Sequence, residues 1–339
     1  MASLTNHQVR LAARPTGLPK PDVWEHTEET VGDPAPGQFV VRISHLSLDP
    51  AMRGWMNPYR SYVPPVGIGE VMRAGGAGTV VASAHRDFAV GEHVTGMFGV
   101  QEYAESDGRG VQKVDTAAAA LPTYLGLLGM PGMTAYFGLF EVGAMREGET
   151  VVVSGAAGAV GHVVGQLAKL KGGRTVGIAG GPDKCAWLAD ELGFDATIDY
   201  RSEDVGRALR THAPDGIDIY FDNVGGDILD AALTNLRRGA RVPLCGAISQ
   251  YNAEGRPVGP SNYLSLLVNR ARMQGFLVFD YADRYGEATA EMAGWLREGR
   301  LQSREHVVKG AVAQFPDTLL MLFGGENTGK LVLQINDEE

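Results

Sequence analysis

The chain has 339 residues, of which 44% are hydrophobic and 21% are charged, as expected of a globular protein with about two domains. Its formal net charge of −10 argues against a nucleic-acid or anionic-membrane partner, and the sequence has no apolar run of about 18 residues that would suggest a membrane span. The N-terminus lacks the apolar core of a signal peptide, and the use of only two cysteines indicates a reducing compartment, so we predict a cytoplasmic protein.

Residues 1–125 are expected to form short antiparallel strands in a small barrel-like domain. Residues 37–44 alternate apolar and polar side chains, as a half-buried strand does, and Asp49-Pro50 marks a turn. Residues 67–81 are rich in glycine and valine, which favours twisted, bulged strands. Residues 88–95 predict a turn followed by a strand.

From residue 126 to 299 strands and helices alternate, which predicts a doubly wound parallel sheet. Ligands of such sheets bind beyond the carboxyl ends of the strands, so several chain segments should face one crevice. The expected strands are 150–153, 174–178, 196–200, 216–223, 240–245 and 273–279, the expected helices are 134–142, 183–192, 203–213 and 227–238, and the expected crevice segments are 154–155, 179–180, 223–226 and 246–249.

The stretch from Glu149 to Gly181 has the order strand, glycine turn, helix, strand that a dinucleotide-binding site requires. Its helix begins between Gly158 and Gly161, where small residues let the backbone approach a pyrophosphate and the helix N-terminus supplies free N–H groups. The glycine pattern is imperfect because Ala156 stands where the first glycine is usual. The alternative interpretation is an ordinary tight turn.

The residues after the second strand of this stretch indicate which cofactor binds. An NAD site usually has an acidic residue there that bonds the ribose 2′-OH. This chain has Gly180 and Gly181 instead, followed by Asp183 and Lys184. The missing acid and the nearby cation suit the 2′-phosphate of NADP(H). The alternative is that Lys184 is a solvated residue in the first turn of the next helix.

Residues 300–339 return to the pattern of the first domain, with a strand expected at 306–309, a helix at 315–323 and a strand at 330–335. We expect this tail to pack on the N-terminal domain. Cys185 and Cys245 both lie in the nucleotide-binding segment, and the histidines lack the spacing of zinc ligands, so we predict that the protein has no catalytic metal.

Several short motifs follow one another along nearly the whole chain. They are residues 48–54 (LDPAMRG), 129–136 (GMPGMTAY), 155–161 (GAAGAVG), 221–226 (FDNVGG), 245–249 (CGAIS) with Tyr251 and Asn252, 274–276 (QGF) and 325–330 (GENTGK). In this order they resemble the zinc-independent medium-chain dehydrogenase/reductases. Within that family the chain is most similar to the prostaglandin reductase, alkenal double-bond reductase and curcumin reductase group.

The resemblance implies an α/β protein with a GroES-like β-barrel-type catalytic domain, residues 1–125 completed by 300–339, and a Rossmann domain, residues 126–299. It implies NADPH-dependent reduction of the C=C bond of small apolar α,β-unsaturated ketones or aldehydes, by hydride transfer to the β-carbon. It also implies a homodimer formed through the Rossmann domains. The implied cofactor-binding residues are Ala156, Ala157, Gly158, Ala159, Val160, Gly161, Gly180, Lys184, Tyr200, Asn223, Cys245, Gly246, Ala247, Ile248, Tyr251, Phe276, Leu277, Val278 and Asn327.

Four of these residues could instead have a purely structural role. Cys245 would be a small buried residue at a strand end, Tyr200 and Tyr251 would be packing tyrosines, and Asn223 would cap a turn.

The chain departs from the family at two positions, because Ala51 and Val268 stand where relatives carry tyrosine. A hydrogen-bond donor is still needed at the carbonyl oxygen, where negative charge develops during the reaction. The ribose 2′-OH of the cofactor is one candidate, helped by Tyr59, Tyr62 or Tyr103 of the first domain. Met52, Trp55, Met56 and Met133 are candidates for an apolar substrate wall, with core packing as the alternative.

Two other functions remain open. The first is reduction of quinones with NADPH, as in related zinc-free reductases. The second is a weakly catalytic NADPH-binding protein, for which the absence of tyrosine at residues 51 and 268 is the argument.

Overall fold

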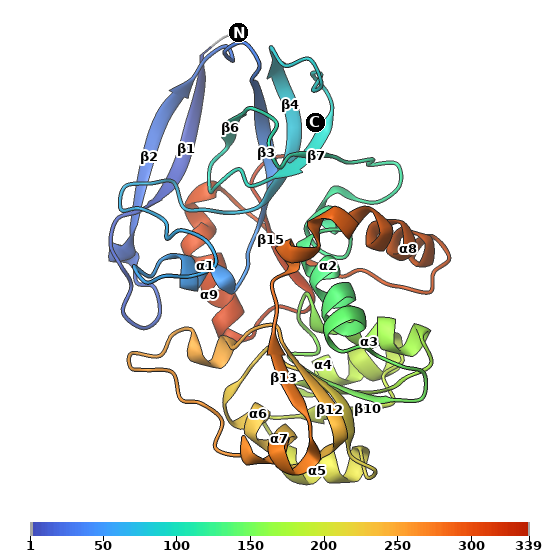
Figure 1. The fold of residues 1–339 in the computed structure, drawn as a ribbon. Coiled ribbons are helices and arrows are strands. Elements are labelled where there is room, and N and C mark those ends of the chain that lie inside the picture. Colours follow the sequence, from blue (N-terminus) through green and yellow to red (C-terminus); the bar gives the residue numbers. More distant parts are fainter. Residues whose placement is uncertain (1–2, 338–339) are drawn as a thin grey trace. The chain divides into compact units, whose positions relative to one another are not determined.

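The computed structural model describes residues 3–337 and divides into two compact units. Of the described residues, the first comprises 3–125 and 305–337, which are blue, cyan and red in Figure 1. The second comprises residues 126–304, which run from green to orange. No helix in the described part of the chain is both long and apolar enough to cross a membrane.

The first unit is built on a two-stranded and a seven-stranded sheet. In the larger sheet the strand order is β14-β15-β3-β4-β5-β7, and β6 also pairs with β3. The elements are β1 (Leu4–Leu11), β2 (Trp24–Val31), β3 (Phe39–Ser47), α1 (Ala51–Trp55), β4 (Gly76–Ser83), β5 (His93–Gly96), β6 (Tyr103–Ser106), β7 (Gln112–Lys113), β14 (Glu305–Lys309), α9 (Phe315–Gly324) and β15 (Lys330–Gln334). Because β15 pairs antiparallel with β3, the C-terminal segment completes this unit.

The strand β3 lies at the centre of the first unit. Its side chains from Phe39 to Ser47 are almost all buried, since it pairs with β4 and β6 and also with β15. Register shifts in its pairing with β4 bend the sheet, as bulges do. Phe315 and Leu319 of α9 and Leu333 of β15 are fully buried in the same core cluster.

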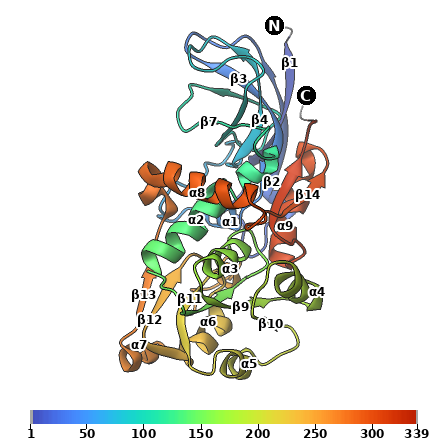
Figure 2. The same ribbon diagram turned by 90° about the vertical axis from the view of Figure 1, so that its right-hand side faces the viewer.

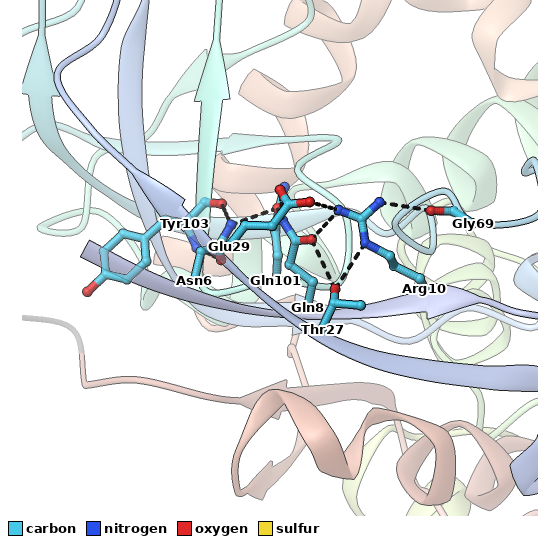
Figure 3. A network of polar contacts seen from close by, with 8 residues as sticks. All are labelled: Asn6, Gln8, Arg10, Thr27, Glu29, Gly69, Gln101 and Tyr103. Atoms are coloured by element: carbon cyan, nitrogen blue, oxygen red, sulfur yellow. Dashed lines mark hydrogen bonds and ion pairs between the residues drawn. The ribbon is translucent and has the colours of Figure 1, made fainter. Parts of the chain in front are cut away.

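A polar network ties the two-stranded sheet to the rest of the first unit (Figure 3). Gln101 accepts hydrogen bonds from Asn6 at 3.1 Å and Gln8 at 2.9 Å through its Oε1 atom. Arg10 donates to the carbonyl oxygen of Gly69 at 2.8 Å and also pairs with Glu29. Because Asn6 and Gln8 are buried polar side chains, β1 does not show the alternation that predicts a strand, and neither β1 nor β2 is predicted from the sequence.

The second unit is organised around a six-stranded parallel sheet with the order β10-β9-β8-β11-β12-β13. Helix α3 lies on one side of the sheet, and α5 and α6 lie on the other (Figure 2), so the predicted doubly wound fold is confirmed. The elements are α2 (Met130–Phe137), β8 (Thr150–Ser154), α3 (Gly161–Leu170), β9 (Arg174–Ala179), α4 (Pro182–Ala186), β10 (Ala196–Asp199), α5 (Val205–His212), β11 (Ile217–Phe221), α6 (Gly226–Leu233), β12 (Leu236–Leu244), α7 (Leu264–Asn269), β13 (Arg272–Gly275) and α8 (Tyr285–Arg297).

Some sequence predictions of element bounds are wrong. The helix predicted at 227–238 ends at Leu233, because Leu236 already begins the pairing of β12 with β11. The strand predicted at 273–279 ends at Gly275, and Val278–Arg284 forms a 3₁₀ segment. The turn predicted at Asp49-Pro50 is confirmed, and it is followed at once by the short helix α1, of which Pro50 is the N-cap.

Candidate active site

The sheet of the second unit has its topological switch point between β8 and β11. Connections run from β8 outward to β9 and β10, and then cross to β11, β12 and β13 on the other side. Loops that leave the carboxyl ends of β8 and β11 therefore diverge and form the crevice in which such sheets bind ligands.

The glycine turn after β8 is shaped for close approach of the backbone. Gly155 has a φ of +58°, and a Cβ atom added to Gly161 would lie 2.3 Å from the carbonyl oxygen of Gly155. Ala156 is fully buried and does not adopt a positive φ, so the absent glycine at this position imposes no backbone strain. The turn thus brings the N-terminus of α3 against the end of β8, as a pyrophosphate site requires.

The structure brings the predicted 2′-phosphate residues together. A Cβ atom added to Gly180 would lie 2.8 Å from the Tyr200 hydroxyl, so this tyrosine lies against the glycine backbone. Lys184 is partly buried at the start of α4, and burial together with the nearby Arg201 guanidinium lowers the pKa of its ammonium. The Arg201 Nη1 atom lies 3.9 Å from the position of an added Gly181 Cβ. Two cations and a phenol therefore surround the end of β9.

One carboxylate does lie at this end of the sheet, on Asp199 of β10. It accepts hydrogen bonds from the backbone N–H groups of Gly181 at 2.8 Å and Arg201 at 3.0 Å, and from the Ser202 hydroxyl at 2.9 Å. These backbone hydrogen bonds lower the pKa of Asp199. The carboxylate is thus used to hold the loop that carries Tyr200 and Arg201.

At the other side of the switch point, the structure joins Asn223 to the segment after β12. The Asn223 side-chain amide donates to the carbonyl oxygen of Ser154 at 2.7 Å, and the backbone carbonyl oxygen of Asn223 accepts from Ile248 N–H at 3.3 Å. The backbone N–H of Ala247 donates to the Tyr251 hydroxyl at 3.2 Å, and the same hydroxyl would lie 2.9 Å from a Cβ at Gly246. Hydrogen bonds therefore join these predicted residues beyond the carboxyl ends of β8, β11 and β12.

The remaining predicted residues of this unit lie at the same edge. Phe276 follows the end of β13, packs against Phe221 with a ring-centroid distance of 6.3 Å, and is followed by Leu277 and the buried Val278. Cys245 donates its backbone N–H to the Asp222 carbonyl oxygen at 2.9 Å. Burial and the Asp222 carboxylate raise the pKa of the Cys245 thiol to about 12. The pKa of the Cys185 thiol is also raised, mainly by burial and further by Asp199 and Glu203.

The candidates Tyr59, Tyr62, Tyr103 and Asn327 lie in the first unit. Tyr59 is 75% exposed, Tyr62 accepts a hydrogen bond from Trp55 Nε1 at 3.1 Å, and the Tyr103 ring points away from the network in Figure 3. Asn327 donates its amide to the Gly329 carbonyl oxygen at 2.8 Å. None of these contacts tests a catalytic or cofactor-binding role, so these roles stay predictions.

The methionine candidates are deeply buried. Met52 and Met56 are fully buried in the core cluster of the first unit, together with Trp55, as the packing alternative expects. Met133 belongs to α2 of the second unit and is 2% exposed, with the Thr289 hydroxyl 3.9 Å from its sulfur. Contact of these four residues with a substrate stays a prediction.

Sequence reasoning missed Arg201 and Asp222. Arg201 directly follows Tyr200 at the end of a strand, a signal that could have drawn attention to it. Asp222 lies inside the FDNVGG motif, but its buried contacts depend on β8 and cannot be read from the motif. Within residues 3–337, no group of three or more His, Cys, Asp or Glu side chains is placed to hold a metal ion.

Comparisons with known proteins match both parts of the chain. Residues 7–114 match the family described as the N-terminal domain of oxidoreductase, and residues 159–294 match the family described as zinc-binding dehydrogenase. The chain is 42% identical to the NADPH-dependent curcumin reductase of Escherichia coli over 98% of each chain. It is 40% identical to the 2-alkenal reductase (NADP(+)-dependent) of Nicotiana tabacum over 99% of each chain.

A solved structure shows the same fold over the full length. The crystal structure of CurA from Vibrio vulnificus in complex with NADPH superposes with a TM-score of 0.93 at 46% identity, covering 98% of this chain and 99% of that one. The strand order, the glycine turn and these full-length similarities agree with one another. The chain therefore belongs to the NADP(H)-dependent, zinc-independent medium-chain dehydrogenase/reductases, in the group of the curcumin and alkenal reductases.

Proposed function

We propose that the protein uses NADPH to reduce the C=C bond of small apolar α,β-unsaturated ketones or aldehydes. The observation that carries the proposal is the cluster of Lys184, Arg201 and Tyr200 at the end of β9, where an NAD-dependent enzyme would present a carboxylate. The two relatives that share the full length of the chain are named as reductases of curcumin and of 2-alkenals, which are enones and enals.

The chain's own residues fit NADP(H) along the whole crevice. A Cβ at Gly161 would collide with the backbone of Gly155, so the glycine turn from Gly155 to Gly161 keeps the N-terminus of α3 close to the end of β8, where it would face a pyrophosphate. Lys184 and Tyr200, with Arg201, would bind the 2′-phosphate. Asn223 and residues 245–251 would contact the nicotinamide half. When bound, NADPH supplies the hydride that adds to the β-carbon of the substrate.

The protein must then stabilise the enolate and allow a proton to reach the α-carbon. A donor at the carbonyl oxygen lowers the barrier because negative charge develops there. Tyr59, Tyr62 and Tyr103 are the side-chain candidates, and the ribose 2′-OH is the alternative donor. Water would deliver the proton to the α-carbon, so that one hydride and one proton saturate the bond and the carbonyl is kept.

The test follows the loss of NADPH absorbance with 3-nonen-2-one, 4-hydroxynonenal, a 15-oxo-prostaglandin, curcumin and a benzoquinone, with NADH in parallel. We expect oxidation of NADPH by enones or enals and a product two hydrogens heavier that keeps its carbonyl. Turnover of the quinone alone would favour a quinone reductase. NADPH binding without any turnover would favour the weakly catalytic alternative, to which Ala51 and Val268 point.

We further propose that the protein forms a homodimer through its second unit. Strand β13 is an edge strand of the parallel sheet, and its residues Arg272, Gln274 and Gly275 are exposed. The adjacent helix α7 exposes Leu264 by 58%, Leu267 by 75% and Val268 by 65%. An unpaired edge beside exposed apolar side chains is a surface that a second copy would cover.

A further inference from the structure

One buried carboxylate lies at the switch point of the parallel sheet. Asp222 is 1% exposed, and its Oδ1 atom accepts from the Ser154 hydroxyl at 2.9 Å and the Tyr220 hydroxyl at 3.2 Å. The same atom accepts from the backbone N–H groups of Val224 at 3.1 Å and Gly225 at 3.0 Å. A single oxygen thus connects the end of β8, the strand β11 and the turn that follows it.

These bonds determine the orientation of Asn223. Because the Ser154 hydroxyl donates to Asp222, its oxygen is available to accept, and the backbone N–H of Asn223 donates to it at 2.9 Å. The side-chain amide of Asn223 donates to the carbonyl oxygen of Ser154 at 2.7 Å. The main chain of Asn223 is therefore held by the Ser154 hydroxyl, which Asp222 orients, and its side chain is held by the Ser154 backbone carbonyl.

A second set of contacts extends from the same turn to the segment after β12. The Asp222 carbonyl oxygen accepts from Cys245 N–H at 2.9 Å and Gly246 N–H at 3.1 Å. The Val224 carbonyl oxygen accepts from the Ser249 backbone N–H at 3.2 Å and from its hydroxyl at 2.6 Å. When the carboxylate fixes the turn at 223–226, it fixes residues 245–249 as well.

The arrangement is costly for the fold. The Asp222 Oδ2 atom is buried and has no hydrogen-bond partner in the described part of the chain. Burial raises the pKa of this carboxyl group. A buried oxygen without a partner destabilises a folded protein, and such groups in native structures call for an explanation beyond packing.

We propose that Asp222 is a positioning residue that holds Asn223 and residues 245–249 in place for the nicotinamide half of NADPH. The proposal rests on the proposed binding of that half at the carboxyl ends of β11 and β12. Asp222 is far from exposed and acts through Ser154 and the backbone, so it serves neither as a ligand of the cofactor nor as a proton donor. The adenosine half, bound at the end of β9, does not depend on it.

The experiment compares two ligands in the full-length protein by calorimetry. NADPH probes both halves of the site, and adenosine 2′,5′-bisphosphate probes the β9 end alone. For Asp222→Ala we expect NADPH affinity to fall roughly 10- to 100-fold, since several hydrogen bonds that fix the turn are lost. The affinity for adenosine 2′,5′-bisphosphate should stay within about twofold. Asp222→Asn, which keeps an acceptor at Oδ1, should recover much of the NADPH affinity.

Two further variants separate positioning from general damage. Asp218 lies at the amino end of the same strand, where its carboxylate accepts from Thr150 N–H at 2.9 Å and from Arg237. The control variant Asp218→Ala should therefore leave the affinities for both ligands unchanged. If Asp222→Ala does not fold, Ser154→Ala removes the hydroxyl that joins Asp222 to the Asn223 backbone N–H but keeps the bond from the Asn223 amide to the Ser154 carbonyl oxygen. This variant should show a smaller loss with the same selectivity for NADPH.

Equal weakening of both ligands, or no change in NADPH affinity, would overturn the proposal. Because binding is measured without turnover, the outcome is independent of the substrate assignment. A selective loss of NADPH affinity in a protein that reduces no enone would support the positioning role while the proposed reaction fails.

Discussion

Lys184 and Arg201 place two positive charges beside the glycines that end β9. The pKa of Lys184 is lowered first by burial and then by repulsion from the Arg201 charge. The dianionic 2′-phosphate of NADPH would relieve this repulsion, whereas the ribose hydroxyl of NADH would not. Under the proposed assignment, the preference between the two cofactors would depend on two side chains, one from helix α4 and one from the loop after β10.

We predict that Lys184→Ala raises the dissociation constant of NADPH by roughly 10- to 100-fold, because a charge-assisted hydrogen bond contributes about 1.5–3 kcal/mol. Arg201 is exposed, so Arg201→Ala should cost only about two- to fivefold. NADH binding should change little in either variant. Fluorescence titration measures the dissociation constants of both cofactors. Lys169→Ala is the control, since Lys169 lies near the end of α3 and pairs with Asp195. Equal losses for NADPH and NADH would contradict the assignment.

At the scale of elements, the edge of the parallel sheet carries the proposed dimer. We predict that Leu267→Arg on α7 converts a dimer into a monomer, because a charge would be buried against the partner. Sedimentation analysis at several protein concentrations measures the effect. Val90→Arg is the matched control, since Val90 is also exposed, by 64%, but belongs to the first unit. If the wild-type protein sediments as a monomer, the proposed dimer is wrong.

The elements also show what the sequence could predict. The parallel strands of the second unit are confirmed because buried β-branched runs between glycine turns mark them clearly, as Thr150 to Val153 do. The start of β12 was missed because the exposed Arg237 and Arg238 continue the polar face of the preceding helix. Arg201 and Asp222 were missed because their neighbours come from other strands, and such contacts exist only after the sheet has formed.

At the scale of the whole molecule, the first unit is assembled from both ends of the chain. The ammonium of Lys330 at the start of β15 is 1% exposed and bonds the Leu48 carbonyl oxygen at 2.6 Å and the Asp49 carboxylate at 2.7 Å. The Ser47 hydroxyl donates to the other oxygen of Asp49. One buried ion pair therefore joins the C-terminal strand to the loop before α1.

Removing one member of this pair leaves the other buried without its counter-charge. We predict that Lys330→Met lowers the free energy of unfolding of the first unit by about 3–5 kcal/mol, whereas the double variant Asp49→Asn/Lys330→Met loses less than the sum of the single changes. Guanidinium denaturation curves measure both. Lys309→Met, at the exposed end of the neighbouring strand β14, should stay within about 0.5 kcal/mol of the wild type. Additive losses would show that Lys330 and Asp49 are not coupled.

The raised pKa values of Cys185 and Cys245 have a consequence for the lifetime of the enzyme among the enones and enals that we propose as its substrates. Enones and enals are Michael acceptors, and they alkylate thiolates rather than thiols. Because a raised pKa favours the protonated thiol at neutral pH, both cysteines of the folded protein should resist alkylation by these electrophiles. Peptide mapping after treatment with 4-hydroxynonenal should find both cysteines unmodified in the folded protein and alkylated after denaturation. Alkylated cysteines in the folded protein would contradict this expectation and would mean that such electrophiles can inactivate the enzyme.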